Sequence, residues 1–250
     1  MNDHEFAAWA ATQAGELLTE VRTRGLVGKE LKDAGDLASH EFLMALIAEH
    51  RPDDAILSEE EHRGTTSRVD RRTAKRVWII DPLDGTREFS EPPRDDWAVH
   101  VALWEDGDLI AGAVAQPGLN TTFQTGAGLS VPPPNSEKPR LVVSRTRPPT
   151  FMAGLVDELD AELVPMGSAG AKAMSVVRGV SDAYVHAGGQ FEWDSAAPVA
   201  VARDAGLFTS RVDGSPLTYN HDNPRLPDLV ICRPELAEAI LAYLAANPPS

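Results

Sequence analysis

Two aspartates stand three residues apart in the segment 77–86, which reads Val-Trp-Ile-Ile-Asp-Pro-Leu-Asp-Gly-Thr. The apolar residues favour a buried strand, and the Gly-Thr pair can open a helix, so the acids are expected where a strand ends. The carboxylates of Asp81 and Asp84 and the carbonyl of Leu83 are hard oxygen ligands of the kind that Mg²⁺ prefers. The glycine lets the backbone approach a ligand closely, and the amides of a helix starting at Thr86 would face an anion. The segment therefore predicts metal and phosphate binding at one turn; an Asp-rich loop with one helix-capping aspartate is the alternative.

Two other acidic positions lie near predicted strand ends. The run Ser58 to Glu61 follows a short apolar segment, residues 55–57, that predicts a strand. Asp194 follows a glycine-containing segment and opens an Ala-rich stretch that predicts a helix. Acidic runs are usually solvated and helix-opening aspartates are usually caps, so each position alone has a structural explanation. Beside the Asp81 turn, a functional role becomes the stronger interpretation of the acidic run.

Composition limits the classes of partner. The chain has 250 residues, of which 42% are hydrophobic and 24% charged, as is ordinary for a soluble globular protein. Its net charge of −15 would repel a nucleic-acid polymer or an anionic membrane, so neither is expected as a partner. The single cysteine, Cys232, excludes an intramolecular disulfide and is expected in the core. Because no signal-peptide pattern opens the chain and no run of 18 apolar residues occurs, we expect a cytoplasmic protein.

The elements that must position these acids can be predicted from periodicity. Apolar residues at three- and four-residue intervals predict helices over 4–24 and about 36–49. Strands are predicted at 55–57, 77–80, 97–104, 109–115 and 121–125. Strands near 141–143, 164, 182–186 and 229–232 then alternate with helices that start near 148, 170, 193 and after 232. This alternation predicts an α/β architecture of mixed sheets with helices layered against them.

The proline-rich segment 126–139 is the best candidate for a boundary within the chain. We expect an N-terminal α+β part, residues 1–130, which carries the metal turn, and a C-terminal α/β part, residues 138–250, in one compact catalytic unit. Residues 63–75 are charged, lack a clear period and are expected to form a loop over the site. His186, in a predicted strand, is expected to be a structural histidine.

Three motifs occur in a fixed order along the chain. They are Ser-Glu-Glu at 58–60, Trp-Ile-Ile-Asp-Pro-Leu-Asp-Gly-Thr at 78–86 and Trp-Asp-Ser-Ala-Ala-Pro at 193–198. Together they resemble the inositol monophosphatase superfamily of Mg²⁺-dependent, lithium-sensitive phosphatases, and most closely its CysQ-type 3'(2'),5'-bisphosphate nucleotidases. The resemblance covers essentially the whole chain. It implies the layered αβαβα sugar-phosphatase fold, two or three Mg²⁺ ions and a small-molecule phosphate ester as substrate, and it allows a homodimer.

The resemblance also implies a role for each matching residue. Metal ions would be held by Glu59, Asp81, the Leu83 carbonyl, Asp84 and Asp194. The substrate would be contacted by Leu83, Asp84, Gly85, Thr86, Arg145, Ser168, Lys172 and Asp194. Thr86 and Glu59 would position and activate the attacking water, and Asp36 would orient Thr86. Phosphate-monoester hydrolysis needs accelerations of up to ~10²¹, and paired metals neutralise charge at phosphorus and at the leaving oxygen, so the implied carboxylates suit this chemistry.

Two positions bear on which ester is cleaved. Inositol monophosphatases usually carry a glutamate seven residues before the aspartate of the Trp-Asp motif, where this chain has Ala187. Lys172 matches a nucleotidase lysine that helps to hold the uncleaved phosphate as a point charge. Both favour a doubly phosphorylated nucleotide, and the leading hypothesis is removal of the 3'-phosphate of adenosine 3',5'-bisphosphate in sulfur metabolism. Arg145 resembles a further nucleotidase element or is a surface residue. The chain also departs from the nucleotidases: Asp33 stands where they commonly have threonine, and the segment around Ser168 is one residue longer.

Other activities fit parts of the pattern. An inositol-1-monophosphatase or a fructose-1,6-bisphosphatase would use the same site. A regulatory protein that binds metal and phosphate without turnover is a different class, supported by nothing beyond the altered segment before Asp36. A haloacid-dehalogenase-type phosphatase is disfavoured, because its Asp-x-Asp-x-Thr spacing differs from the spacing of Asp81, Asp84 and Thr86.

Overall fold

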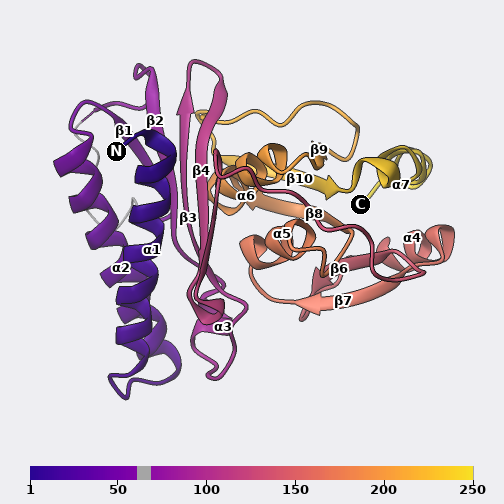
Figure 1. Ribbon diagram of the computed structural model, residues 1–250, viewed down its shortest axis with the longest axis horizontal. Helices are drawn as coiled ribbons and strands as arrows, with labels where there is room; N and C mark the ends of the chain where they lie inside the picture. Colours follow the sequence, from indigo (N-terminus) through magenta and orange to yellow (C-terminus); the bar gives the residue numbers. More distant parts are fainter. Residues whose placement is uncertain (61–68, 250) are drawn as a thin grey trace.

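Alternating layers of helices and sheets form the described part of the chain, residues 1–60 and 69–249 of a computed structural model (Figure 1). Helices α1 (Asp3–Arg22) and α2 (Gly28–His50) make the first layer. A five-stranded sheet follows, then helices α5 (Ala169–Val177) and α6 (Glu192–Asp204), then a second five-stranded sheet. Helices α4 (Met152–Leu159) and α7 (Pro234–Ala246) cover the far side. The predicted αβαβα sandwich is therefore confirmed.

The first sheet carries the acidic turn. Its strands are β1 (Ala55–Ser58), β2 (Arg76–Asp84), β3 (Ala98–Glu105), β4 (Asp108–Gln116) and β5 (Thr121–Gln124), in that order across the sheet. β1 and β2 are parallel, and the later pairs are antiparallel. The short helix α3 (Thr86–Phe89) follows β2, and the 3-10 turn η2 (Pro117–Leu119) precedes β5. Because β2 pairs on both sides and is buried from Val77 onward, its backbone holds Asp81 and Asp84 in fixed positions.

The second sheet supplies the helices of the middle layer. Its strands are β6 (Arg140–Ser144), β7 (Glu162–Met166), β8 (Ala183–Phe191), β9 (Phe208–Ser210) and β10 (Arg225–Cys232), with the order β7-β6-β8-β10-β9. β6 is parallel to both β7 and β8, whereas β10 is antiparallel to β8 and β9. α5 follows β7 and α6 follows β8 directly, so the start of each helix lies at the end of a strand facing the first sheet.

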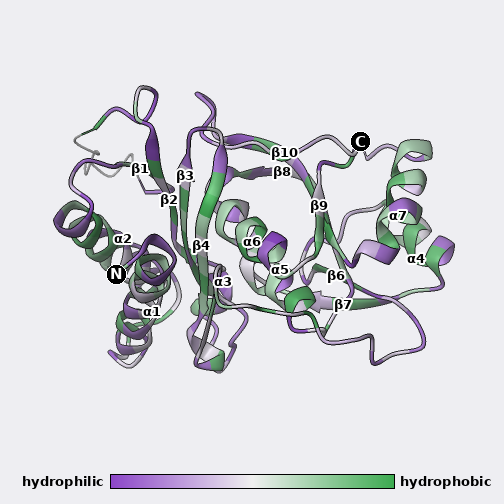
Figure 2. Ribbon diagram, turned by 45° about the horizontal axis from the view of Figure 1, so that its top comes forward, coloured by the Kyte–Doolittle hydropathy of each residue, from purple (hydrophilic) through white to green (hydrophobic). Residues whose placement is uncertain are grey.

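Three hydrophobic cores fill the spaces between the layers. One joins α1 and α2 to the first sheet and contains the T-shaped pair of Phe6 and Trp78. A second lies between the two sheets and includes buried apolar residues of α5 and α6, whose ribbons show hydrophobic stretches beside polar ones (Figure 2). The third joins the second sheet to α4 and α7 and includes the predicted core residue Cys232, which is fully buried. Burial of apolar surface at about 25 cal/mol per Å² therefore stabilises the contact between the sheets and the helices that carry the site.

Local chemistry explains where the prediction of elements was right and where it was wrong. α1 begins as expected, because the side chain of Asn2 accepts from the amide of Glu5 in a capping box. α2 starts at Gly28 instead of near 36, so the segment directly before Asp36 is also helical. Val27 offers no side-chain cap that would mark this start. α4 begins four residues after Pro148.

Three further findings concern the elements. The three-residue strand β9 was not predicted. The loop expected at 63–75 lies partly outside the described residues. None of the described helices has the length and apolar character needed to cross a membrane.

Candidate metal centre and substrate pocket

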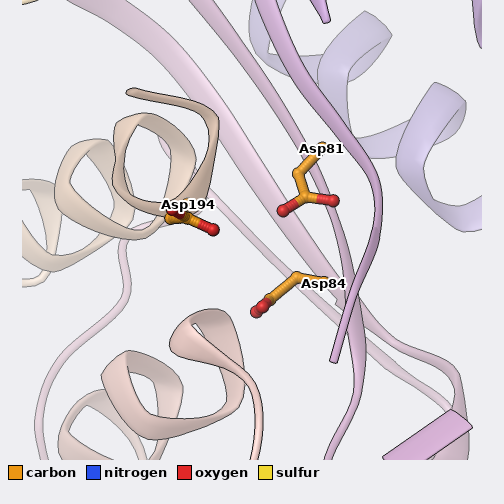
Figure 3. A group of neighbouring side chains, drawn as sticks. All are labelled: Asp81, Asp84 and Asp194. Atoms are coloured by element: carbon orange, nitrogen blue, oxygen red, sulfur yellow. The ribbon is translucent and has the colours of Figure 1, made fainter. Parts of the chain in front are cut away.

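Three carboxylates converge between the first sheet and the middle helices. Asp81 and Asp84 come from β2, and Asp194 comes from the first turn of α6. One oxygen from each lies within 4.8 Å of the others, and the side chains point toward a common space (Figure 3). Asp81 is 1% exposed and Asp84 is 8% exposed. The geometry thus joins acids that are 110 residues apart in the sequence.

Burial leaves much of this negative charge without compensation. It raises the pKa of Asp81 well above the usual value, and repulsion from Glu59 adds to the effect. Burial likewise raises the pKa of Asp194 to about 6 and that of Glu59 to about 8, with Asp84 and Asp194 respectively as the strongest repelling charges. Hydrogen bonding to Asp81 lowers the pKa of Glu59 in part, so the two side chains are in contact, although Glu59 is not one of the three acids that lie within 4.8 Å of one another. Buried, mutually repelling oxygen donors fit a hard divalent cation such as Mg²⁺.

Asp84 has different surroundings from Asp81. Its carboxylate accepts from the hydroxyl of Ser168 and from the amides of Ala169 and Gly170, at 3.1 and 2.6 Å. His100 Nε2 lies 3.2 Å from Asp84 Oδ2. Burial alone would raise the pKa of Asp84, but His100, Lys172 and Ser168 outweigh it and lower the pKa. The start of α5 therefore holds this carboxylate in place.

The residues expected to handle water lie beside the cluster. Thr86 Oγ1 is 3.2 Å from the carbonyl oxygen of Leu83 and 3.5 Å from Asp36 Oδ1. The single hydroxyl hydrogen can therefore be donated to either acceptor. Asp33 stands where the nucleotidases commonly have threonine, but it is not the partner of Thr86. Its half-exposed side chain instead forms an ion pair with Lys29, one turn earlier on α2.

A cavity of about 360 Å³ opens next to the carboxylates. Lys172 is 7% exposed at its wall, and its Nζ donates to the Ser168 carbonyl at 2.5 Å and lies 5.3 Å from the centre of the Tyr184 ring. The cavity is lined by the following predicted substrate residues: Asp84, Gly85, Thr86, Arg145, Ser168, Lys172 and Asp194. Leu83, whose side chain is buried, does not line it. The pocket thus combines acids at one end with a buried lysine.

Several residues that line the pocket make specific contacts in the structure. Arg145 Nη2 donates to Glu88 Oε1 at 2.8 Å and to Glu91 Oε2 at 3.0 Å, so the guanidinium ties the segment after β6 to α3. Ser168 caps α5 by accepting from the amide of Ala171 at 2.9 Å. His186 lines the cavity, while its Nε2 lies 3.3 Å from the Gly189 carbonyl oxygen.

Ala187 lies outside this cavity. It lines a neighbouring cavity of about 510 Å³, and Gly189 contributes to both. Sequence reasoning missed His100 and Glu88. His100 could have been found only from its register opposite Asp81, and Glu88 only as an acid within one turn of Thr86.

The fold and the acidic cluster define a class of protein. The chain belongs to the inositol monophosphatase family, whose model matches residues 3–248. It is 47% identical to the 3'-phosphoadenosine 5'-phosphate phosphatase of Mycobacterium leprae (strain TN), over 98% of this chain and 94% of that protein. It is 29% identical to the 3'(2'),5'-bisphosphate nucleotidase CysQ of Escherichia coli (strain K12), over 74% of this chain and 78% of the relative.

Solved structures share the fold. Inositol monophosphatase-II from Staphylococcus aureus MSSA476 superposes with a TM-score of 0.83 at 21% identity, covering 99% of this chain and 95% of that one. CysQ from Bacteroides thetaiotaomicron, a bacterial member of the same family, gives a TM-score of 0.75 at 25% identity, covering 92% and 97%. The predicted family and fold are therefore confirmed.

Proposed function

We propose that this protein is a Mg²⁺-dependent phosphatase that removes the 3'-phosphate of 3'-phosphoadenosine 5'-phosphate and releases AMP. The observation that carries this proposal is the 47% identity, over nearly the whole chain, to a 3'-phosphoadenosine 5'-phosphate phosphatase. The three converging carboxylates beside a lysine-lined cavity support the same conclusion from the geometry.

Each part of the site has a proposed task. Asp81, Asp84 and Asp194, with Glu59 and the Leu83 carbonyl, would hold two or three Mg²⁺ ions. Mg²⁺ bound there would supply charge neutralisation at phosphorus and lower the pKa of water at the site.

The remaining groups would act on water and on the rest of the substrate. Thr86, which lies within reach of Asp36 and the Leu83 carbonyl, would orient the attacking water, and Glu59 would accept its proton. Lys172, buried in the cavity wall, would attract the phosphate that stays on the nucleotide. The cavity of about 360 Å³ would enclose part of the substrate and limit its contact with bulk water.

Ala187 favours a nucleotide over inositol phosphate. The inositol monophosphatases that this chain resembles use a glutamate at the matching position to grip the hydroxyls of the sugar ring, whereas the alanine side chain has no polar atom. Ala187 also faces the neighbouring cavity and not the one beside the acids. We therefore expect inositol 1-phosphate and fructose 1,6-bisphosphate to be poor substrates.

A panel of phosphate esters tests the proposal. Phosphate release would be measured with 3'-phosphoadenosine 5'-phosphate, inositol 1-phosphate and fructose 1,6-bisphosphate, each with Mg²⁺, with EDTA and with added Li⁺. We expect Mg²⁺-dependent release that is fastest with the bisphosphorylated nucleotide and is inhibited by Li⁺. Faster release from either sugar phosphate would refute the substrate assignment, and nucleotide binding without any release would favour a regulatory protein.

A further inference from the structure

His100 lies beside the acidic cluster, with its Nε2 3.2 Å from Asp84 Oδ2, although it belongs to β3, which carries no other site residue. It is the register partner of Asp81 across the β2–β3 pair, so the two side chains lie on the same face of the sheet. Its side chain is fully buried. The ring therefore lies next to the turn that supplies two of the three converging carboxylates.

Both ring nitrogens face acceptors on different elements. Nδ1 lies 2.9 Å from the carbonyl oxygen of Trp193, which can only accept, so Nδ1 is the donor. Nε2 lies 3.2 Å from Asp84 Oδ2. Trp193 directly precedes Asp194 in the first turn of α6. One ring thus lies between a carboxylate of β2, which it faces at ion-pair distance without the geometry of a hydrogen bond, and the helix that delivers the third carboxylate, to which it donates.

Helix α5 packs closely against the imidazole ring of His100. A methyl group on Gly170 would lie 2.0 Å from His100 Nε2, so only a glycine fits against the ring at this position. The amide of Gly170 donates to the same Asp84 oxygen that His100 faces. His100 therefore sets how closely β2, α5 and α6 approach one another at the site.

We propose that His100 is a positioning residue of the metal centre, which holds Asp84 and the first turn of α6 at the separation that lets the three carboxylates share a cation. This inference rests on the proposed function only in taking Mg²⁺ as that cation. Partners that orient metal ligands commonly change metal affinity or activity by about 10–100-fold when they are replaced.

Calorimetric titration of Mg²⁺ without substrate tests the proposal directly. We expect His100→Ala to weaken Mg²⁺ binding at least about tenfold. His100→Gln, whose amide nitrogen can reach the Nε2 position, should retain more affinity than His100→Asn, whose amide reaches only the Nδ1 position. Val101→Ala is the matched control, because Val101 is also on β3 but packs in the core beside α1 and α2. It should lower the melting temperature and leave Mg²⁺ affinity unchanged.

Gly170 provides a second, independent test. Gly170→Ala should weaken Mg²⁺ binding as His100→Ala does, because the added methyl group must displace the imidazole. In the double variant the methyl group enters the space left by the ring, so its Mg²⁺ affinity should be no lower than that of His100→Ala alone. Fully additive losses would contradict a shared mechanism.

The outcomes separate this inference from the proposed function. If wild-type protein binds Mg²⁺ and His100→Ala binds it within twofold as tightly, while its melting temperature falls as in Val101→Ala, His100 only packs and the proposal is wrong. If the wild-type protein itself binds no Mg²⁺, the metal assignment fails, and the role of His100 in it fails with it.

Discussion

Asp81 and Asp84 lie three residues apart on one strand, yet their surroundings shift their pKa values in opposite directions. Asp81 is buried beside other acids, so its pKa is raised, whereas donors from α5 and His100 lower the pKa of Asp84 despite its burial. One carboxylate is thus held charged by the protein, and the other is left for a cation to neutralise. The single Asp-x-x-Asp motif therefore supplies two carboxylates with different electrostatic surroundings.

Asp84 and Asp194 are expected both to hold metal and to contact the substrate, so replacing either one tests the metal assignment. Asp84→Asn and Asp194→Asn should each lower turnover at least ~10³-fold, because each removes a carboxylate that would hold the Mg²⁺ ions that neutralise the developing negative charge. Circular dichroism should show a retained fold. Asp106→Asn is the matched control, since Asp106 is exposed in the β3–β4 turn, and it should leave turnover unchanged. Near-full activity in either site variant would refute the assignment.

Lys172 tests how the second phosphate is recognised. Lys172→Met keeps most of the side-chain volume and removes the charge, so KM for 3'-phosphoadenosine 5'-phosphate should rise about tenfold or more, with a smaller change in kcat. Lys138→Met, at an exposed lysine paired with Asp160, should change neither constant. An unchanged KM in Lys172→Met would show that the lysine only packs against Tyr184.

Residue types could be predicted from the sequence where the chemistry is local. The spacing in 77–86 is enough to make Asp81 and Asp84 candidate ligands, and the family resemblance adds Asp194. His100 could not be found in this way, because a histidine in an apolar strand has no local signal. Its position opposite Asp81 depends on strand register, which the sequence does not display.

At the scale of elements, the site forms where the first turns of α5 and α6 lie against the end of β2. α5 donates two backbone amides to Asp84, and at the start of α6 Asp194 accepts from the amide of Phe191 at 2.6 Å. Gly85 has a φ of +84°, and a methyl group there would lie 2.9 Å from the Ser168 side chain, so glycine permits this close approach. The two halves of the chain are thus joined at the site itself.

The contact between Arg145 and Glu88 yields a prediction about these elements. If the guanidinium acts by tying the segment after β6 to α3, Arg145→Ala and Glu88→Ala should weaken turnover to a similar extent, and the double variant should be no worse. The two replacements should also couple only weakly in thermal unfolding, because solvent screens the exposed guanidinium. Glu91→Ala, at a more exposed partner, should have a smaller effect. A raised KM in Arg145→Ala alone would instead indicate direct substrate contact.

The order of elements could be predicted from periodicity, but their limits could not. α1 carries a capping box and was placed well, whereas α2 begins without a side-chain cap and was predicted to start eight residues late. That error concealed the helical residues just before Asp36, so that Asp36, whose side chain faces Thr86, lies within α2 and not at its start. β9 has three residues, too few for a periodic signal.

For the whole molecule, the acidic cluster couples stability to pH and metal. The folded-state pKa values of Glu59 and Asp194, about 8 and about 6, are raised above their ordinary values of 4.5 and 3.8, first by burial and then by neighbouring acids. The stabilising contribution of these two protonated carboxyl groups is therefore complete below pH ~4. It is lost as the pH rises through about 6 for Asp194 and about 8 for Glu59. Without metal, the melting temperature should fall over this interval.

Added Mg²⁺ should reverse that loss. At about 100 times its Kd, a ligand that binds only the folded state stabilises by about 2.7 kcal/mol, which is roughly 5–10 °C for a chain of this size. Because protons compete for the same oxygens, the Mg²⁺-induced shift should be larger at pH 8 than at pH 5. Thermal unfolding at both pH values measures it. An equal shift at the two pH values would contradict a carboxylate site.

We propose that this acidic pocket cleaves the 3'-phosphate of a nucleotide bisphosphate. Phosphorus NMR of 3'-phosphoadenosine 5'-phosphate incubated with the protein and Mg²⁺ tests it most directly, because it identifies which phosphate leaves. We predict that the 3'-phosphate signal disappears while inorganic phosphate and 5'-AMP accumulate together, and that EDTA stops the reaction. Accumulation of 3'-AMP, or an unchanged spectrum at enzyme concentrations that hydrolyse inositol 1-phosphate, would contradict the account.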